Sequence, residues 1–282
     1  MQPIWFEWFG EVTGWSWLSG ARLSQWIIFA CSGLAAAGLG VWSMRRQGLD
    51  WRFGLGMIVS AVVVGGLFGH LISVLVRPDK LFADPWRLVI LFRGGISSYG
   101  VYGGAVVGAV MWAKWRGGAF WPHADALAPG FLVGAALARM SCLLHGCDFG
   151  RVAPGLPWGI RYARGTPAFK YLEQLDMIDP FRDQGLPMHP FPLYEAAPVL
   201  LVGLVALLWP LSPGRVTGRR AAACAALYCI ARLFAEHFRG EPVGPMPLLA
   251  AIQWLCLLGA ALFALLGWRL GRSPMTDEAR RT

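Results

Sequence analysis

Charged side chains interrupt the apolar stretch near residue 230 at the spacing of one helix face. Arg232, Glu236 and Arg239 stand at positions i, i+4 and i+7, which are neighbours on a helix. A charge at membrane depth costs about 2.5–3.5 kcal/mol on insertion scales, so such residues usually pair with one another or mark a functional site. Glu236 can pair with either arginine. Two arginines against one carboxylate leave a surplus positive charge on this face.

A second apolar segment carries one arginine, Arg139, and Arg151 follows just beyond it. If the two segments pack together, their arginines form a cationic site at membrane depth. This pattern predicts an anionic ligand, and a phospholipid phosphate is the main candidate, because the guanidinium fork binds phosphate oxygens in pairs. Two simpler interpretations stay open: a structural ion-pair network, and arginines that lift their charged heads to the membrane surface.

Membrane helices are the elements that must position these arginines. Of the 282 residues, 56 % are hydrophobic and 15 % are charged, whereas a soluble domain carries about 25 % charged residues. The low content of charged residues excludes a disordered chain, and the long apolar runs exclude a soluble fold. We attribute the net charge of +9 to cytoplasmic loops near anionic lipids, and we predict no nucleic-acid partner.

The distances between consecutive charged residues locate the helices, because a membrane span needs about 20 apolar residues. Five stretches are uncharged over this length, and two more are interrupted only by Arg139 or Arg232. We therefore predict an all-α polytopic membrane protein with seven transmembrane helices. The predicted helices are 24–43, 53–76, 95–113, 126–144, 194–212, 219–238 and 247–268.

The charges in the short connections predict the orientation. Basic residues gather in the connections near residues 45–52 and 114–116 and in the C-terminal tail, so the C-terminus is predicted to be cytoplasmic and the N-terminus outside. The first residues carry no cleavable signal pattern. We predict a single membrane domain over 1–282, with an outer surface arm at 77–94 and a small periplasmic head at 145–193.

Short motifs in this order resemble those of the prolipoprotein diacylglyceryl transferases, which are bacterial inner-membrane enzymes with seven helices and an outer head. The segment ADP at 83–85 is followed by GGIS at 94–97, similar to the family's ADP and GGMS. RMSCLLHGCDFGR at 139–151 has the length and frame of R-x-G-N-F-x-N-G-E-x-x-G-R. PWG at 157–159 and HPFPLYE at 189–195 resemble the family's PW and HPxQLYE, and 232–239 reproduces R-x-x-x-E-x-x-R.

The resemblance implies transfer of a diacylglyceryl group from phosphatidylglycerol to a cysteine thiol of a prolipoprotein signal peptide, with a thioether and glycerol phosphate as products. It implies that Arg139 and Arg232 are catalytic and hold the donor phosphate, with Arg239 and Arg151 in support and Glu236 orienting them. The substrate-binding residues implied in the same way also include Gly94, Gly95, Tyr102, Gly150, Tyr194 and Glu195.

A base must help to ionise the acceptor thiol, whose ordinary pKa is about 8.5. The family histidine falls on Tyr99, or on Tyr102 if a short insertion is allowed, and tyrosine is a poor base at neutral pH because its ordinary pKa is near 10. We take Tyr99 and His145 as catalytic candidates, with His145 the first choice for the base. Asp148 is a second candidate, as a base or as the partner of an arginine. Further histidines at outer helix ends are His70, His189 and His237.

Two cysteines replace polar residues of the family signature. Cys142 stands in the place of its asparagine and Cys147 in the place of its glutamate. Three interpretations stay open: a disulfide on the oxidising side of the membrane, nucleophiles that carry the lipid transiently, and small apolar fillers.

The departures from the family pattern also keep other functions open. One is a related transferase with a different acceptor, and another is a non-catalytic membrane protein that binds or translocates phospholipid. We predict no metal site, because the cysteines lack zinc-site spacing, and no cofactor. The predicted partners are phosphatidylglycerol, a prolipoprotein signal peptide and the bacterial cytoplasmic membrane.

Overall fold

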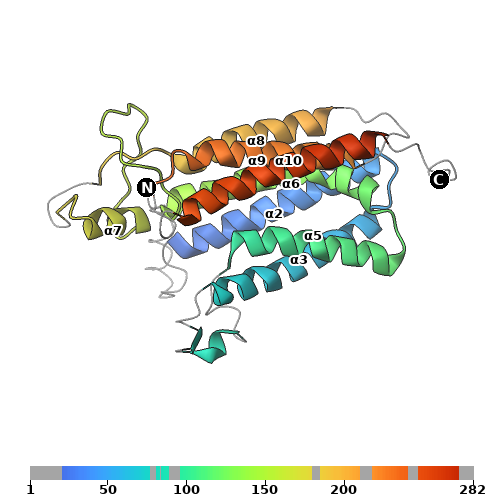
Figure 1. Cartoon of the computed structure of the whole chain (residues 1–282), viewed down its shortest axis with the longest axis horizontal. Coiled ribbons are helices and arrows are strands. Elements are labelled where there is room, and N and C mark those ends of the chain that lie inside the picture. The colour runs from blue at the N-terminus through green and yellow to red at the C-terminus, as the bar shows by residue number, and fades with distance from the viewer. Residues whose placement is uncertain are drawn as a thin grey trace, which may run out of the picture. The chain divides into compact units, whose positions relative to one another are not determined.

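The computed structural model of the chain describes residues 21–76, 81–82, 84–88, 96–179, 185–209, 218–240 and 247–272. Within these ranges the regular structure is helical, apart from three isolated antiparallel bridges. The long helices are α2 (Ala21–Arg46), α3 (Trp51–Leu75), α5 (Ser98–Arg116), α6 (Phe120–His145), α8 (Phe191–Leu208), α9 (Arg219–Glu236) and α10 (Pro247–Arg272) (Figure 1). A short helix, α7 (Pro167–Gln174), and a 3₁₀ turn, η1 (Pro85–Leu88), lie in the connections.

Each of the seven predicted segments coincides with one long helix. By length and composition, α2, α3, α6, α8 and α10 can cross a membrane. α5 and α9 do not belong to this group: α5 is rich in glycine, and α9 carries three arginines. An all-α polytopic membrane protein is therefore confirmed for the described residues, and the count of seven spans stays a prediction.

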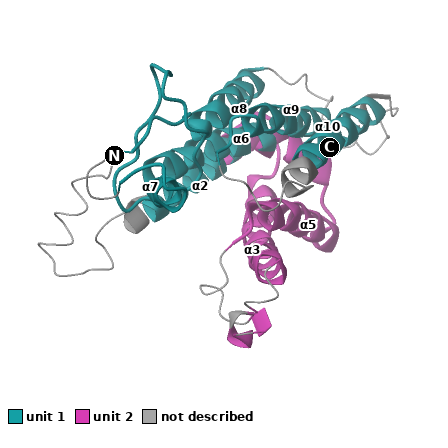
Figure 2. Ribbon diagram, turned by 60° about the vertical axis from the view of Figure 1, so that its left-hand side comes forward, with its two compact units in different colours: residues 1–40, 128–282 teal, residues 41–127 magenta. Residues whose placement is uncertain are grey.

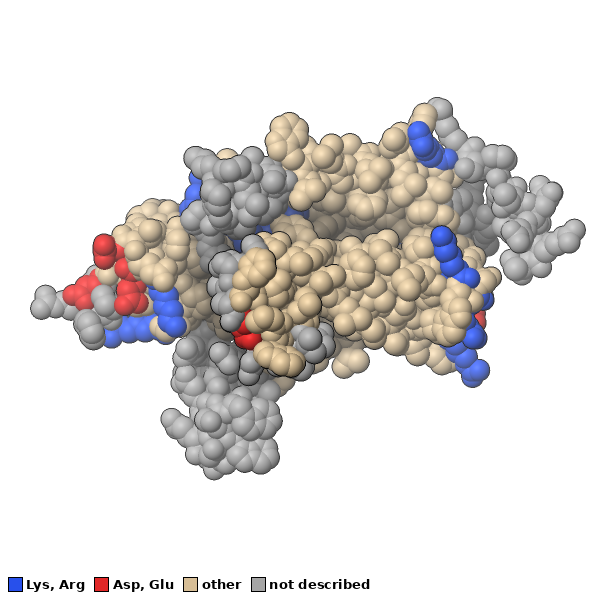
Figure 3. Space-filling model, turned by 60° about the horizontal axis from the view of Figure 1, so that its bottom comes forward, with Lys and Arg blue, Asp and Glu red and all other residues tan. Residues whose placement is uncertain are grey.

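The flanks of the long helices are apolar. Val62 on α3, Leu201 on α8 and Leu258 on α10 are all exposed. On the face shown in Figure 3, the helix flanks are uncharged and the charged side chains lie at the helix ends. Apolar surface of this extent marks an interaction site in a soluble protein, and here it matches the hydrocarbon layer of a membrane.

The chain divides into two compact units, residues 41–127 and residues 1–40 with 128–282 (Figure 2). The single membrane domain remains a prediction. In residues 41–127, which are unit 2 in Figure 2, glycines let α3 and α5 approach closely. A Cβ on Gly104 would lie 2.8 Å from the carbonyl oxygen of Val64, and one on Gly108 would lie 2.4 Å from that of Ser60. Small residues of this kind allow membrane helices to pack backbone against backbone.

In residues 1–40 and 128–282, which are unit 1 in Figure 2, α6 packs against the first part of α2 and against α8 and α9. A Cβ on Gly134 of α6 would lie 2.7 Å from the carbonyl oxygen of Ser32 on α2. A small apolar core joins α6, α8 and α9 and includes Leu132, Ala136, Ala196, Val199, Cys224 and Ala231. These contacts bring the C-terminal ends of α6 and α9 to the N-terminal end of α8.

The connection between α6 and α8 has a core of its own, in the region predicted to be the head. Phe149, Phe169, Leu172 and Met188 are buried together there. Thr166 caps α7, and its hydroxyl accepts a hydrogen bond of 3.3 Å from the backbone N–H of Phe169. Most of the predicted arm at 77–94 lies outside the described residues; the structure describes 81–82 and 84–88 of it, which include η1.

Candidate functional site

Two of the arginines found in the sequence meet at one buried carboxylate. The carboxylate belongs to Glu195, one turn into α8, and its side chain is 1 % exposed. Arg139 Nη2 on α6 lies 2.6 Å from Glu195 Oε1. Arg232 Nη1 on α9 contacts Glu195 Oε2 by a short ion pair. Glu195 therefore joins α6 and α9 through its two oxygens, which its family motif alone does not indicate.

The same two arginines continue into further ion pairs. Arg232 Nη2 lies 2.9 Å from Glu236 Oε2, and Arg239 Nη1 lies 3.4 Å from Glu236 Oε1. Asp148, in the loop after α6, contacts Arg239 Nη2 at 3.3 Å and Arg139 Nη1 at 3.1 Å. The pairs close into a ring in which arginines and carboxylates alternate. We call it the charge ring; its members are Arg139, Glu195, Arg232, Glu236, Arg239 and Asp148.

The charge ring corrects one expectation from the sequence. The spacing on α9 predicted a surplus of positive charge, but the structure places three carboxylates among three arginines. The formal charge of the ring is therefore zero. Glu195 and Asp148 supply the missing negative charges from α8 and from the signature loop, and local spacing on α9 could not reveal either contribution. Arg239 also lies just beyond the end of α9, which is shorter than predicted.

The carboxylates differ in how firmly they are held. The side chains of Glu195 and Glu236 are 1 % and 0 % exposed, and both stand on helices. The side chain of Asp148 is 12 % exposed and stands on a loop. Asp148 is thus the most exposed of the three carboxylates and the only one of them that stands on a loop.

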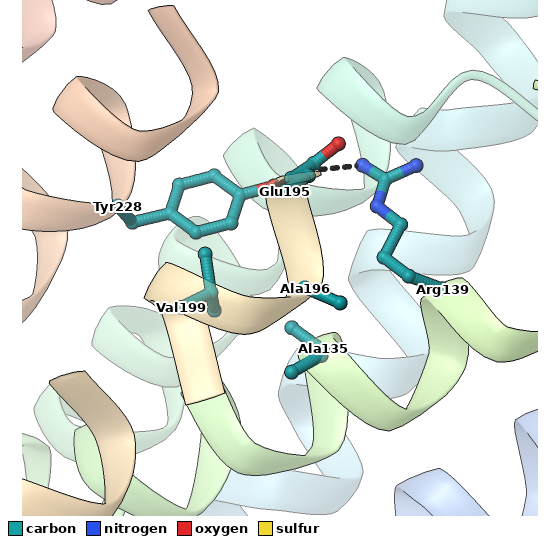
Figure 4. A pocket seen from close by; sticks show the side chains of 7 residues that line it. Ala135, Arg139, Glu195, Ala196, Val199 and Tyr228 are labelled. Carbon is teal, nitrogen blue, oxygen red and sulfur yellow. Dashed lines mark hydrogen bonds and ion pairs between the residues drawn. The ribbon is translucent and has the colours of Figure 1, made fainter. Parts of the chain in front are cut away.

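A small pocket opens beside Arg139 and Glu195 (Figure 4). Ala135 and Val199 line its apolar side, and Tyr228 of α9 also lines it. The hydroxyl of Tyr228 donates a hydrogen bond of 3.3 Å to Glu195 Oε1. Sequence reasoning missed Tyr228, although its position one turn before Arg232 on the same helix was a signal that could have found it.

Backbone contacts hold the signature loop against the end of α9. Gly150 and Arg239 form an antiparallel bridge, and the N–H of Arg151 donates to the carbonyl oxygen of Phe238 at 3.0 Å. A Cβ on Gly150 would lie 2.5 Å from the carbonyl oxygen of His189. Only glycine fits where these segments meet, so Gly150 serves first to bring Asp148 and Arg239 together.

Four aromatic side chains, Trp158, His189, Tyr194 and Phe238, form a cluster. Tyr194 and Phe238 directly precede the ring members Glu195 and Arg239 in the sequence. Trp158 donates to the Tyr194 hydroxyl at 2.9 Å, and that hydroxyl lies 3.1 Å from His189 Nδ1. The Phe238 ring packs on both His189 and Tyr194. Burial, and then the nearby positive charge of Arg151, lower the pKa of His189, so this histidine is neutral at neutral pH.

The remaining predicted site residues are not members of the charge ring. His145 ends α6 and is half-buried, and Arg151 is exposed in the signature loop. Tyr99 and Tyr102 stand in the first turns of α5, in the other compact unit, where Tyr99 is exposed. Gly94 and Gly95 lie outside the described residues. Within the described ranges, no group of three or more histidine, cysteine or acidic side chains could hold a metal ion.

A family model described as prolipoprotein diacylglyceryl transferase matches residues 23–269 of this chain. The phosphatidylglycerol–prolipoprotein diacylglyceryl transferase of Chromobacterium violaceum is 31 % identical over 222 residues, which cover 74 % of this chain and 77 % of the relative. The protein of that name from Verminephrobacter eiseniae is 31 % identical over 282 residues, covering 96 % and 91 %. That from an Azoarcus species is 29 % identical over 273 residues, covering 90 % and 87 %.

Proposed function

Since the chain belongs to the prolipoprotein diacylglyceryl transferase family, we propose that its charge ring binds the phosphate of phosphatidylglycerol and stabilises the leaving group. The protein is a membrane transferase of lipoprotein biosynthesis. It moves the diacylglyceryl group of phosphatidylglycerol to a cysteine thiol of a prolipoprotein and releases glycerol phosphate. The observation that carries the proposed site is the meeting of three arginines from two helix ends around one buried cluster.

The chemistry explains why arginines are needed. The acceptor thiolate attacks the glycerol carbon, the carbon–oxygen bond breaks, and the phosphodiester oxygen leaves with the electron pair. Negative charge therefore grows on the phosphate in the transition state. Guanidinium donors that are already fixed there stabilise this charge without reorganisation. Arg139 and Arg232 are the donors we assign, with Arg239 and Arg151 in support.

Because every arginine of the charge ring is already paired with carboxylates, one carboxylate must leave before the ring can bind a phosphate. We propose that the donor phosphate displaces the carboxylate of Asp148 and takes its place between Arg139 and Arg239. Asp148 contacts both arginines at 3.1 and 3.3 Å, so it occupies the position that suits a phosphate oxygen. Glu195 and Glu236 stay in place and orient the guanidinium groups, because both are buried on helices.

For the base that ionises the thiol, we propose His145, with Tyr99 as the second catalytic candidate. His145 follows Arg139 on the same helix by less than two turns. His189 is a third candidate, because its lowered pKa keeps the imidazole neutral at neutral pH. General-base catalysis contributes about 10²- to 10⁴-fold to a rate, so replacing the true base should cost at least the lower figure.

We propose the topology and remaining contacts as follows. The protein crosses the bacterial inner membrane seven times, with the N-terminus outside and the C-terminus in the cytoplasm. The surface arm and the head then lie outside, where the prolipoprotein signal peptide arrives. Further contacts to the substrates come from Gly94, Gly95, Tyr102, Gly150 and Tyr194.

The proposed site is tested by reconstitution in phosphatidylglycerol vesicles with a signal peptide that carries the acceptor cysteine. Wild type, Arg139→Ala and the control Arg164→Ala, which removes an exposed arginine of the same connection, are assayed side by side. Mass spectrometry follows the thioether peptide and the released glycerol phosphate. We expect both products from wild type and from the control, and loss of both in Arg139→Ala.

Other results distinguish the alternatives. Release of glycerol phosphate without a modified peptide would keep the donor site and point to a different acceptor. If folded wild type binds the lipid and forms neither product, the transferase assignment fails and a binding or translocating role takes its place.

A further inference from the structure

The two cysteines of the signature loop are brought together by the way in which α6 ends. Gly146 follows the last residue of α6 with φ +66°, and its N–H donates to the carbonyl oxygen of Cys142 at 2.9 Å. This left-handed helix cap turns the chain back, so the residue after the glycine approaches the last helical turn. That residue is Cys147, and this kind of cap ordinarily brings it against the residue that Cys142 occupies in the last helical turn, so the two thiols lie close together.

Both thiols are free and neither is fully buried. Of the other described cysteines, Cys224 and Cys256 are buried in the helix packing. Glycine is required at the cap, because a Cβ on Gly146 would lie 2.9 Å from the Tyr162 ring in a backbone conformation that other residues rarely adopt. The backbone turn at Gly146 is therefore what brings the two cysteines together.

We propose that Cys142 and Cys147 form a redox modification site, a reversible disulfide that closes the signature loop and holds Asp148 in the charge ring. The inference that oxidation slows turnover rests on the proposed function, because Asp148 must leave the ring to admit phosphate. Cys147 directly precedes Asp148, and Cys142 follows Arg139 by three residues. The disulfide would therefore tie the helix that carries Arg139 to the residue next to Asp148.

The oxidant is a disulfide, either that of a thiol oxidase or of glutathione. One thiol of the pair loses its proton and attacks this disulfide, which gives a mixed disulfide and one released thiol. The second thiol loses its proton and displaces the oxidant's remaining sulfur. Two electrons pass to the oxidant, which leaves as two thiols, and a thiol reductant reverses the reaction. Transient carriage of the lipid on either cysteine is excluded by chemistry, since a thioether is not a leaving group under these conditions.

The test uses the full chain in phosphatidylglycerol vesicles, treated with glutathione disulfide and then with dithiothreitol. Peptide mapping by mass spectrometry identifies the linked cysteines. We expect the Cys142–Cys147 crosslink in wild type and in the control Cys229→Ser. Cys142→Ser and Cys147→Ser should each retain one thiol, which takes up glutathione as a mixed disulfide. Crosslinks that involve other cysteines, or two thiols that alkylate fully after the oxidant, would overturn the site.

Activity is measured on the same samples. We expect oxidised wild type to turn over at least fivefold more slowly, recovery with dithiothreitol, and no response in the variant that carries both serines. A crosslinked wild type with unchanged turnover would overturn the control of Asp148 by this disulfide. A reduced wild type without any transferase activity would instead count against the proposed function, and the mass spectra would still decide the fate of the disulfide.

Discussion

The helices of the two compact units are held together by different interactions, close backbone packing in one and ion pairs in the other. In residues 41–127, α3 and α5 meet through Gly100, Gly104 and Gly108, where backbones approach with no charged group between them. In the other unit, the ends of α6, α8 and α9 meet through six charged side chains. The first arrangement shows that this chain can pack membrane helices without buried charges.

The difference indicates why the charge ring exists. Burying ion pairs costs desolvation energy that their attraction often only balances, so apolar residues of similar volume would stabilise the helix contact at least as well. Ionisable groups at membrane depth are by default functional. Function therefore explains the ring better than stability does, which supports the proposal that it binds the donor phosphate. Variants in both regions can test this comparison.

The largest effect is expected from the ring. Arg232→Ala should lower kcat/KM by about 10²- to 10³-fold, as loss of a fixed donor to a developing anion does. Arg232→Lys keeps the charge but loses the planar fork, and should still lose at least about tenfold. The transferase assay in vesicles measures both. Arg220→Ala, on the same helix at its other end, is the control and should retain full activity; equal activity of all variants would contradict the assignment.

At the glycine contact between α3 and α5, substitutions should lower the stability of the protein, whereas in the charge ring they should lower its activity. A Cβ on Gly104 would lie 2.6 Å from Phe68 Cβ, whereas one on Gly103 would meet nothing within 4 Å. Gly104→Leu should therefore lower the free energy of unfolding by about 1–3 kcal/mol through overpacking, and Gly103→Leu should not. Thermal unfolding in detergent, followed by circular dichroism, compares the two variants. Equal melting temperatures would show that the close approach of α3 and α5 carries little stability.

The sequence predicted the helices better than the site. Charge gaps and apolar run lengths located all seven long helices, because membrane insertion depends on local composition. The spacing correctly predicted that Glu236 pairs with both Arg232 and Arg239. The pair with Arg232 follows from helix geometry, whereas Arg239 reaches Glu236 from just beyond the end of α9. The central position of Glu195 and the double contact of Asp148 were not predictable, because they depend on how three helix ends and a loop meet.

The aromatic cluster next to the ring should show a smaller effect, which depends on pH. Because the pKa of His189 is lowered, the neutral form persists at neutral pH and is lost only as the pH falls below the ordinary histidine range. His189→Asn should lower kcat/KM on the order of tenfold at neutral pH, less than loss of a general base, and the acidic limb of the pH profile should change. A loss of 10²-fold or more would instead make His189 the base in place of His145.

The most direct test of the account is the affinity of the charge ring for a phosphate monoester. Calorimetry with glycerol phosphate compares wild type, Asp148→Asn and the control Asp176→Asn, which removes an exposed carboxylate from the same connection. Removing the carboxylate that occupies the site should tighten binding about fivefold, which corresponds to about 1 kcal/mol, and the control should match wild type. If Asp148→Asn binds glycerol phosphate no better than wild type, Asp148 does not hold the place of the phosphate and the central claim is wrong.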